Sequence, residues 1–342
     1  MSSARGRSVL SEPAGTFDIG IVGAGWISSA YHLPILDNLD AADVTFVADI
    51  DGRRARKVCR GYDAKPVEVG EGPATLPPCD VIVLAIPVGV RPAYISEFAD
   101  RNVAIFSEKP FAVDTEMHEE FLRMAGIISC NYMRHHYNVT RQLQGIVQSE
   151  MLGELERVEL IEEGKTGATG LSKDHFQTDP KKGGGGILLE RGCHSLSQLC
   201  EIFDGNVISV TAADITRHDG LDSEVEAVLQ VESVDSVVEV DYHISRIRPI
   251  GSRVVLEFEN EQLEADPYDP ESRVNLRPRT DGSSGDTFEL VPNETVATST
   301  HQAMYLRWKA FLSGLAAGNV DSEAETMPLV TELISEIYDV AA

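Results

Sequence analysis

Apolar and amphipathic segments alternate over the first third of the chain. Short apolar segments at residues 17–22, 43–50, 79–87 and 102–110 predict buried strands, and residues 26–39, 52–62 and 92–101 have the spacing of helices. Strands that alternate with helices favour a doubly wound parallel sheet covered on both faces. We expect this domain to occupy residues 17–125.

The pattern changes after residue 125. Residues 127–133 predict a strand and residues 139–151 a long helix. Strand-like segments at 207–216, 224–232, 236–245, 252–259 and 261–267 then follow one another with short polar turns, which favours antiparallel pairing. The polar stretch 277–290 predicts a surface loop or hairpin, and helices at 301–318 and 326–341 end the sequence. We therefore expect a second domain at residues 126–342 and a flexible arm at residues 1–16.

Composition limits the classes of partner. The 342 residues carry a net charge of −26 and are 42% hydrophobic and 25% charged, as in globular proteins of two domains. A negative surface repels phosphate backbones and anionic lipids, so we expect no nucleic-acid partner and no membrane association. Five cysteines without CxxC spacing favour free thiols in the cytoplasm and no structural zinc. The arm lacks the apolar core of a signal peptide, and the apolar run 81–90 is too short to span a bilayer.

The stretch GAGWIS lies between the first predicted strand and the first predicted helix. Gly23 permits a tight turn there, and Gly25 lets a pyrophosphate approach backbone N–H groups at a helix N-terminus. Ser28 replaces the third glycine of a GxGxxG motif but is small enough for close helix–strand packing. The motif alone is a weak signal, and its place between a strand and a helix strengthens it.

The second predicted strand leads to Asp49, a little more than about 20 residues beyond the glycines. A carboxylate at this place accepts hydrogen bonds from a ribose and repels a 2′-phosphate, which favours NAD. Arg53 and Arg54 follow, and an arginine here can accommodate that phosphate, so NADP stays open. A turn or helix-cap acid is the alternative reading of Asp49.

Two further stretches contain candidate catalytic groups. SEKPF follows a strand, which puts Glu108 and Lys109 at a carboxyl end where α/β folds bind ligands, although a solvated charge pair is the alternative. GGGGILLERGCHS places four glycines before a helix on which Glu190 and His194, four residues apart, share a face. A carboxylate beside an imidazole fixes its tautomer and raises its basicity, as general acid–base chemistry requires. A flexible loop before a core helix is the alternative for this stretch.

The stretches GAGWIS, ADID, AIP, SEKPF, NYMRHHYN and GGGILLERGCH occur in the order typical of one family. From Phe17 on, the chain resembles the Gfo/Idh/MocA oxidoreductases, most specifically in EKP followed by GGG-x3-acid-x3-His. The resemblance implies an N-terminal Rossmann domain and a C-terminal α+β domain with a large open, mostly antiparallel sheet. It also implies NAD(P)-dependent interconversion of a secondary alcohol and a ketone on a sugar, cyclitol or nucleotide-linked sugar. Association through that sheet into homodimers or homotetramers is implied as well.

The resemblance assigns roles to particular residues. It implies that Lys109 and His194 are catalytic, with Glu190 in place of the usual aspartate. The adjacent His135 and His136 are expected to point to different faces, so we expect no metal site. The implied cofactor contacts are Gly23, Gly25, Trp26, Ile27, Asp49, Ile86, Pro87, Glu108 and Lys109. We also expect substrate contacts at Tyr132 and Arg134, and at His175 and Phe176 in the segment that leads to the glycine run. The sequence departs from the family at Val88, Arg91, Asn138 and Ser197, which leaves the substrate open.

Two other functions are open at this point. One is a cofactor-binding regulator without turnover, and the other is NAD-assisted elimination or hydrolysis of a glycoside. The presence of both Lys109 and His194 favours the dehydrogenase. The glycine run is then expected to let the chain pass close to the active site.

Overall fold

The computed structural model describes residues 15–164, 179–183, 185–233, 236–279, 287–290 and 297–342. Nearly all of the expected N-terminal arm lies outside these ranges. The expected substrate contacts His175 and Phe176 lie outside them too.

The first domain is built on a six-stranded parallel sheet with the order β3-β2-β1-β4-β5-β6. Its strands are β1 (Phe17–Val22), β2 (Ala42–Asp49), β3 (Lys65–Glu68), β4 (Val81–Leu84), β5 (Ala104–Ser107) and β6 (Ile128–Cys130). The helices between them include α1 (Leu33–Leu36), α2 (Gly52–Val58), α3 (Arg91–Asp100) and α4 (Thr115–Met124). The doubly wound parallel sheet expected from the sequence is therefore confirmed. Strand β6 joins it from beyond the expected boundary at residue 125.

The chain returns to this first sheet near its end. Helix α8 (Thr300–Ala317) packs Met304 and Trp308 into the same core as Ile19 and Ile21 of β1. The Trp308 ring stacks on Phe106 of β5 at 3.9 Å between centroids. One face of the Rossmann sheet is thus covered by a helix that the sequence pattern assigned to the second domain.

The second domain is built on an eight-stranded sheet with the order β14-β13-β12-β11-β7-β10-β9-β8. Its strands are β7 (Leu155–Glu163), β8 (Val207–His218), β9 (Leu221–Ser233), β10 (Ser236–Ser245), β11 (Arg253–Phe258), β12 (Glu261–Ala265), β13 (Asn275–Pro278) and β14 (Phe288–Glu289). Among the strand pairs that the structure describes in this sheet, only β7–β10 is parallel, so the mostly antiparallel sheet is confirmed. The sequence reading placed no strand at β7, which lies in the middle of this sheet.

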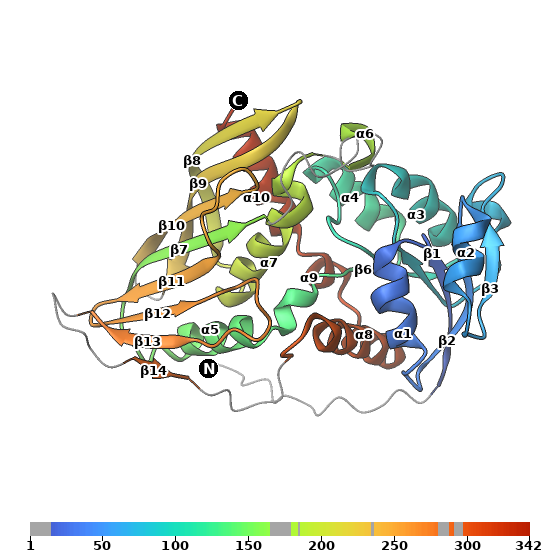
Figure 1. Ribbon diagram of the computed structural model, residues 1–342, viewed down its shortest axis with the longest axis horizontal. Coiled ribbons are helices and arrows are strands. Elements are labelled where there is room, and N and C mark those ends of the chain that lie inside the picture. Colours follow the sequence, from blue (N-terminus) through green and yellow to red (C-terminus); the bar gives the residue numbers. More distant parts are fainter. Residues whose placement is uncertain (1–14, 165–178, 184, 234–235, 280–286, 291–296) are drawn as a thin grey trace.

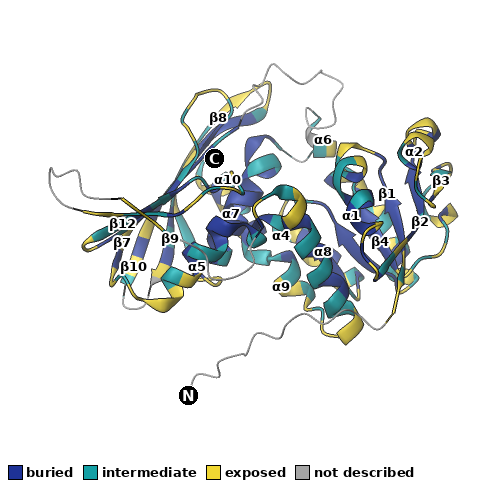
Figure 2. Ribbon diagram, turned by 60° about the horizontal axis from the view of Figure 1, so that its bottom comes forward, coloured by how far each residue is buried: buried dark blue, intermediate teal, exposed yellow. Residues whose placement is uncertain are grey.

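Helices cover one face of the second sheet and separate it from the first domain (Figure 1). They are α5 (Asn138–Ser149), α7 (Cys193–Ile202) and α10 (Pro328–Val340), with the short helices α6 (Pro180–Gly183) and α9 (Ser322–Thr326) nearby. Nearly every residue of α7 is buried, as Figure 2 shows. The candidate catalytic histidine therefore comes from the most enclosed helix of the second domain.

Candidate active site

The turn after β1 has the geometry that the glycine motif predicts. Gly23 adopts φ +100°, and a Cβ there would lie 2.2 Å from the carbonyl oxygen of Ala85, so only glycine fits. Gly25 faces open space, with no atom within 4 Å of a Cβ position. Ser28 stands in for the third glycine and bonds the carbonyl of Gly23 at 2.5 Å. Exposed backbone before a helical segment suits a pyrophosphate.

Asp49 ends β2 directly beside this turn. Its Oδ2 accepts from the backbone N–H of Ala24 at 2.7 Å, and its Oδ1 accepts from Asp51 at 2.8 Å. Next to the turn, the Trp26 side chain is 70% exposed and meets Tyr31 edge-on, while Ile27 packs against the core. A fixed carboxylate beside a bare glycine turn fits the ribose and pyrophosphate of a dinucleotide.

Arg91 ties together the two loops at the carboxyl ends of β4 and β5. Its buried guanidinium donates to the carbonyl of Ile86 at 3.0 Å, and also to the carbonyls of Lys109, Pro110 and Phe111. Burial lowers the pKa of Arg91, and backbone carbonyls take its hydrogen bonds. Arg91, at which the sequence departs from the family pattern, therefore positions Ile86, Pro87 and the segment that contains Lys109.

A buried network orients Glu108, which precedes Lys109. His32 is completely buried and bonds Glu108 at 2.9 Å through Nε2, while Asn131 donates to the same oxygen at 2.6 Å. The indole of Trp308 donates to Nδ1 of His32 at 3.1 Å, so the proton of this imidazole lies on Nε2. Burial opposes ionisation of Glu108, but His32 and Asn131 hold the pKa of this carboxyl below its usual value. The sequence analysis did not single out His32 or Trp308, because they are 276 residues apart.

Lys109 connects the two domains. Its Nζ donates to the backbone carbonyl of Glu190 at 2.7 Å, which joins the loop after β5 to the segment that leads into α7. The sequence placed both stretches near the active site, and the structure brings them into direct contact.

The expected pairing of Glu190 with His194 does not occur. Residues Leu188–Gly192 form a π-helical turn before α7, so residues four apart no longer share a face. Glu190 instead forms an ion pair with Arg246 at 2.5 Å, and Nδ1 of buried His194 has no hydrogen-bond partner among the residues that the structure describes. The prediction that Glu190 orients His194 is therefore wrong.

The glycine run allows the chain to pack closely against β9. A Cβ on Gly186 would lie 2.0 Å from the carbonyl oxygen of Asp222, and one on Gly185 would lie 2.7 Å from Leu189. The Asp222 carboxylate accepts from the backbone N–H groups of Gly186 and Leu188 at 2.8 and 2.7 Å. These glycines therefore let the start of the helical segment lie directly on the β9 backbone.

Arg134 belongs to a buried ion cluster. It donates both terminal nitrogens to the carboxylate of Glu162 at 3.1 and 3.2 Å, and Arg191 donates to the same carboxylate at 3.3 Å. Burial works against the charge of Glu162, but Arg134 and then Arg191 hold its pKa below the usual value. Arg134 is 3% exposed and Tyr132 is 2% exposed, so the structure leaves neither much surface for a direct substrate contact. Sequence reasoning missed Glu162 because it lies on β7.

His194 is held in its neutral form. Its pKa is lowered well below the usual value by burial first, and then by the positive charges of Arg134, Lys109 and Arg191. A neutral imidazole can accept a proton, which is what the oxidation of an alcohol requires.

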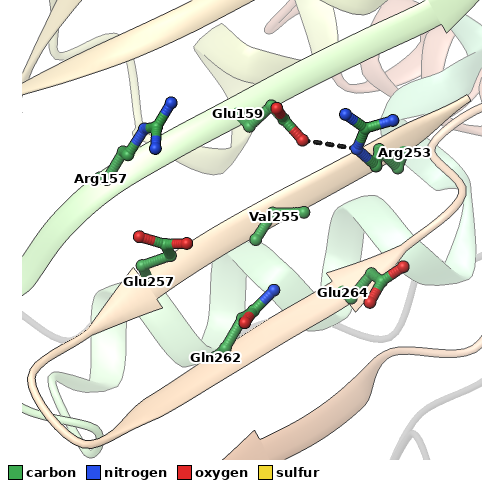
Figure 3. Close-up of a pocket in the computed structure, with 7 residues that line it drawn as sticks. All are labelled: Arg157, Glu159, Arg253, Val255, Glu257, Gln262 and Glu264. Atoms are coloured by element: carbon green, nitrogen blue, oxygen red, sulfur yellow. Dashed lines mark hydrogen bonds and ion pairs between the residues drawn. The ribbon is translucent and has the colours of Figure 1, made fainter. Parts of the chain in front are cut away.

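Charged residues also gather on the uncovered face of the second sheet. Figure 3 shows a hollow there lined by Arg157, Glu159, Arg253, Val255, Glu257, Gln262 and Glu264. Arg253 bonds Glu159 across the strands at 2.5 Å. This face lies opposite the helices and contains none of the candidate catalytic residues. Within the described ranges, no helix is both long enough and apolar enough to cross a membrane.

Family models match most of the chain. Residues 17–136 match an oxidoreductase family with an NAD-binding Rossmann fold, and residues 140–261 match the GFO/IDH/MocA C-terminal domain. An inositol 2-dehydrogenase of Burkholderia cenocepacia is 26% identical over 145 residues, which is 40% of this chain and 43% of the relative. The match thus spans less than half the length of that relative.

Solved structures show the same fold at low sequence identity. A 3-ketoreductase from Actinomadura kijaniata, in complex with NADP and TDP-benzene, has a TM-score of 0.77 and 17% identity over 94% of this chain and 98% of that one. An aldose-aldose oxidoreductase from Caulobacter crescentus has a TM-score of 0.80 and 14% identity over 95% and 97% of the two chains.

Proposed function

The chain belongs to the Gfo/Idh/MocA oxidoreductase family, and we propose that it interconverts a secondary alcohol and a ketone on a sugar, cyclitol or nucleotide-linked sugar. The observation that carries this proposal is the hydrogen bond from Lys109 to the carbonyl of Glu190. It joins the cofactor-binding loop to the segment that contains His194. The similar proteins named above include an inositol 2-dehydrogenase and an aldose-aldose oxidoreductase, which supports this class of substrate.

The proposed chemistry divides between the cofactor and the side chains. When bound, the nicotinamide accepts or supplies the hydride. Neutral His194 takes the proton of the substrate hydroxyl, since its lowered pKa keeps a ring nitrogen free to accept it. Lys109, held in place by Glu190, donates a hydrogen bond to the reacting oxygen and stabilises negative charge that develops there. In the reduction of a ketone the same groups return the proton.

We also propose that the enzyme prefers NAD to NADP. The Asp49 carboxylate is fixed by two backbone N–H groups beside the glycine turn, where its charge repels a 2′-phosphate. Asp49→Ala should bring the ratio of the NADP and NAD dissociation constants closer to one. Measuring both cofactors by titration on the same variant cancels any general loss of stability. A wild-type preference for NADP would contradict the proposal.

The activity is tested with a panel of cyclitols, aldoses and nucleotide sugars, assayed by NADH absorbance. Lys109→Ala should reduce turnover about 100-fold or more while NAD affinity changes little, because the lysine acts on the reacting oxygen. Lys57→Ala, which removes an exposed lysine of α2, is the matched control and should leave turnover unchanged. Near-normal turnover in Lys109→Ala would remove this residue from the mechanism.

For the assembly, we propose a homodimer or homotetramer that associates through the uncovered face of the second sheet. Arginine and glutamate side chains alternate across the hollow of Figure 3, so two copies of this face can pair opposite charges. Light scattering should report a dimer or tetramer, and Arg253→Glu should shift it toward the monomer. A monomeric wild-type protein would refute this assembly.

A further inference from the structure

Positive side chains concentrate around the segment that contains Glu190 and His194. Arg246 pairs with the carboxylate of Glu190, and Lys109 donates to the backbone carbonyl of the same residue. Arg134 and Arg191 pair with the carboxylate of Glu162. The chain as a whole has 55 Asp and Glu against 29 Lys and Arg. Three arginines on two carboxylates is thus the reverse of the overall charge.

The carboxylates do not use all of the arginine donors. Arg134 occupies both oxygens of Glu162, and Arg191 reaches that carboxylate only through Nε. Arg246 reaches Glu190 through Nη2. Among the described residues, Nη2 of Arg191 and Nε of Arg246 are buried without an acceptor, and the two side chains are 15% and 7% exposed. Buried N–H groups are nearly always paired in folded proteins, so these two donors point to a missing acceptor.

The electrostatic environment of His194 agrees with a positive site. After burial, the charges that lower its pKa are those of Arg134, Lys109 and Arg191. Two other buried or half-buried carboxylates are engaged by other groups. Glu108 bonds His32 and Asn131, and Asp266 accepts from backbone N–H groups of its own turn.

We propose that the substrate carries an anionic oxygen group, a carboxylate or a phosphate, and that Arg191 and Arg246 bind it beside His194. The inference rests on the proposed oxidoreductase function and names the class of its substrate. Guanidinium groups suit such anions because their N–H donors match the spacing of carboxylate and phosphate oxygens. The charge of Arg191 acts on His194, so an anionic group bound by Arg191 lies near the reacting carbon. The substrates are then sugar acids or sugar phosphates rather than neutral polyols.

Binding measurements distinguish anionic from neutral substrates without depending on turnover. Isothermal titration with NAD present compares D-gluconate with D-glucitol, and D-glucuronate and D-glucose 6-phosphate with D-glucose. At least one anion should bind about tenfold or more tightly than its neutral counterpart, as expected for charge-assisted hydrogen bonds. A carboxylate that outperforms the phosphate identifies a sugar acid, and the reverse result identifies a phosphorylated sugar.

Variants connect this affinity to the two arginines. Arg246→Gln and Arg191→Gln should each reduce anion affinity about tenfold or more while the neutral compounds bind as before. Arg246→Lys keeps the charge and should recover part of the affinity. Arg101→Gln is the matched control, because Arg101 is also paired with a glutamate, Glu97, but lies at the C-terminal end of α3 in the first domain.

The possible results separate this inference from the proposed activity. If neutral polyols are oxidised and no anion of the panel binds more tightly than its neutral counterpart, the anionic site is refuted and the oxidoreductase activity stands. Anion binding that survives in both Arg246→Gln and Arg191→Gln also refutes the site. If anions bind through these arginines but nothing in the panel is oxidised or reduced, the site stands and the proposed activity is in question.

Discussion

Replacing Glu162 with glutamine should lower the free energy of unfolding by about 3–5 kcal/mol, the cost of breaking a buried ion pair. Glu162 is fully buried and receives three charge-assisted hydrogen bonds, two from Arg134 and one from Arg191. Glutamine has one acceptor oxygen, and its NH₂ group would face a guanidinium. The variant therefore leaves the buried charge of Arg134 without compensation.

The same strand provides a matched control. Glu156 also belongs to β7 and pairs with Arg279 at 2.5 Å, but the two side chains are 47% and 31% exposed. Exposed ion pairs contribute about 0.2–1 kcal/mol, so Glu156→Gln should have an effect several times smaller. The difference between the two variants measures burial rather than strand propensity, because both are the same substitution in one strand.

Urea unfolding measures both variants, with the slope against denaturant as a check on the two-state assumption. The double variant Glu162→Met with Arg134→Met should lose much less than the sum of the two single changes, since it removes both buried charges and leaves Arg191 partly solvated. The pKa of Glu162 is lowered in the fold, so its stabilisation is complete above the unfolded value of about 4.3 and is lost as pH falls through the folded value. If the free energy of unfolding of Glu162→Gln lies within about 1 kcal/mol of the wild-type value, the loss is well below that of a broken buried ion pair and this reasoning is refuted.

Three further predictions follow from burial and packing. For alcohol oxidation, kcat/KM should stay level from pH 8 to about 6.5, the usual pKa of histidine, because the pKa of His194 is lowered well below that value; a pH–rate profile that falls near 6.5 would contradict this. Burial lowers the pKa of His118 to about 4, so its contribution to stability is complete above the unfolded pKa of about 6.5 and is lost as pH falls toward 4. Melting curves at pH 7.5 and 4.5 should show less acid sensitivity in His118→Gln, whereas the same change at exposed His218 should have no such effect. Gly186→Ala should destabilise the protein by several kcal/mol or prevent folding because its Cβ meets the β9 backbone, while Gly145→Ala, in open space on α5, should stabilise it by about 0.5–1 kcal/mol in urea unfolding.

The sequence by itself determined the elements whose signals are local. Short buried strands alternate with helices, so a parallel sheet was predictable, and the turn at Gly23 needs a positive φ that only glycine supplies easily. The motifs around Glu108, Lys109 and His194 were recognisable for the same reason, since each follows a strand or begins a helix. The sequence pattern did not predict strand β7. Glutamate and arginine interrupt the apolar residues of 155–163, so this segment resembles a polar surface segment.

Only the tertiary structure decided which groups meet. A π-helical turn at Leu188–Gly192 rotates Glu190 away from His194 and toward Arg246, and the sequence spacing of four residues does not reveal that change of period. Arg134 reaches Glu162 only because β7 lies inside the second sheet, and Trp308 reaches His32 only because α8 folds back onto the first domain. Ion pairs and hydrogen bonds depend on a few ångströms between segments far apart in the chain, and a linear pattern does not contain those distances.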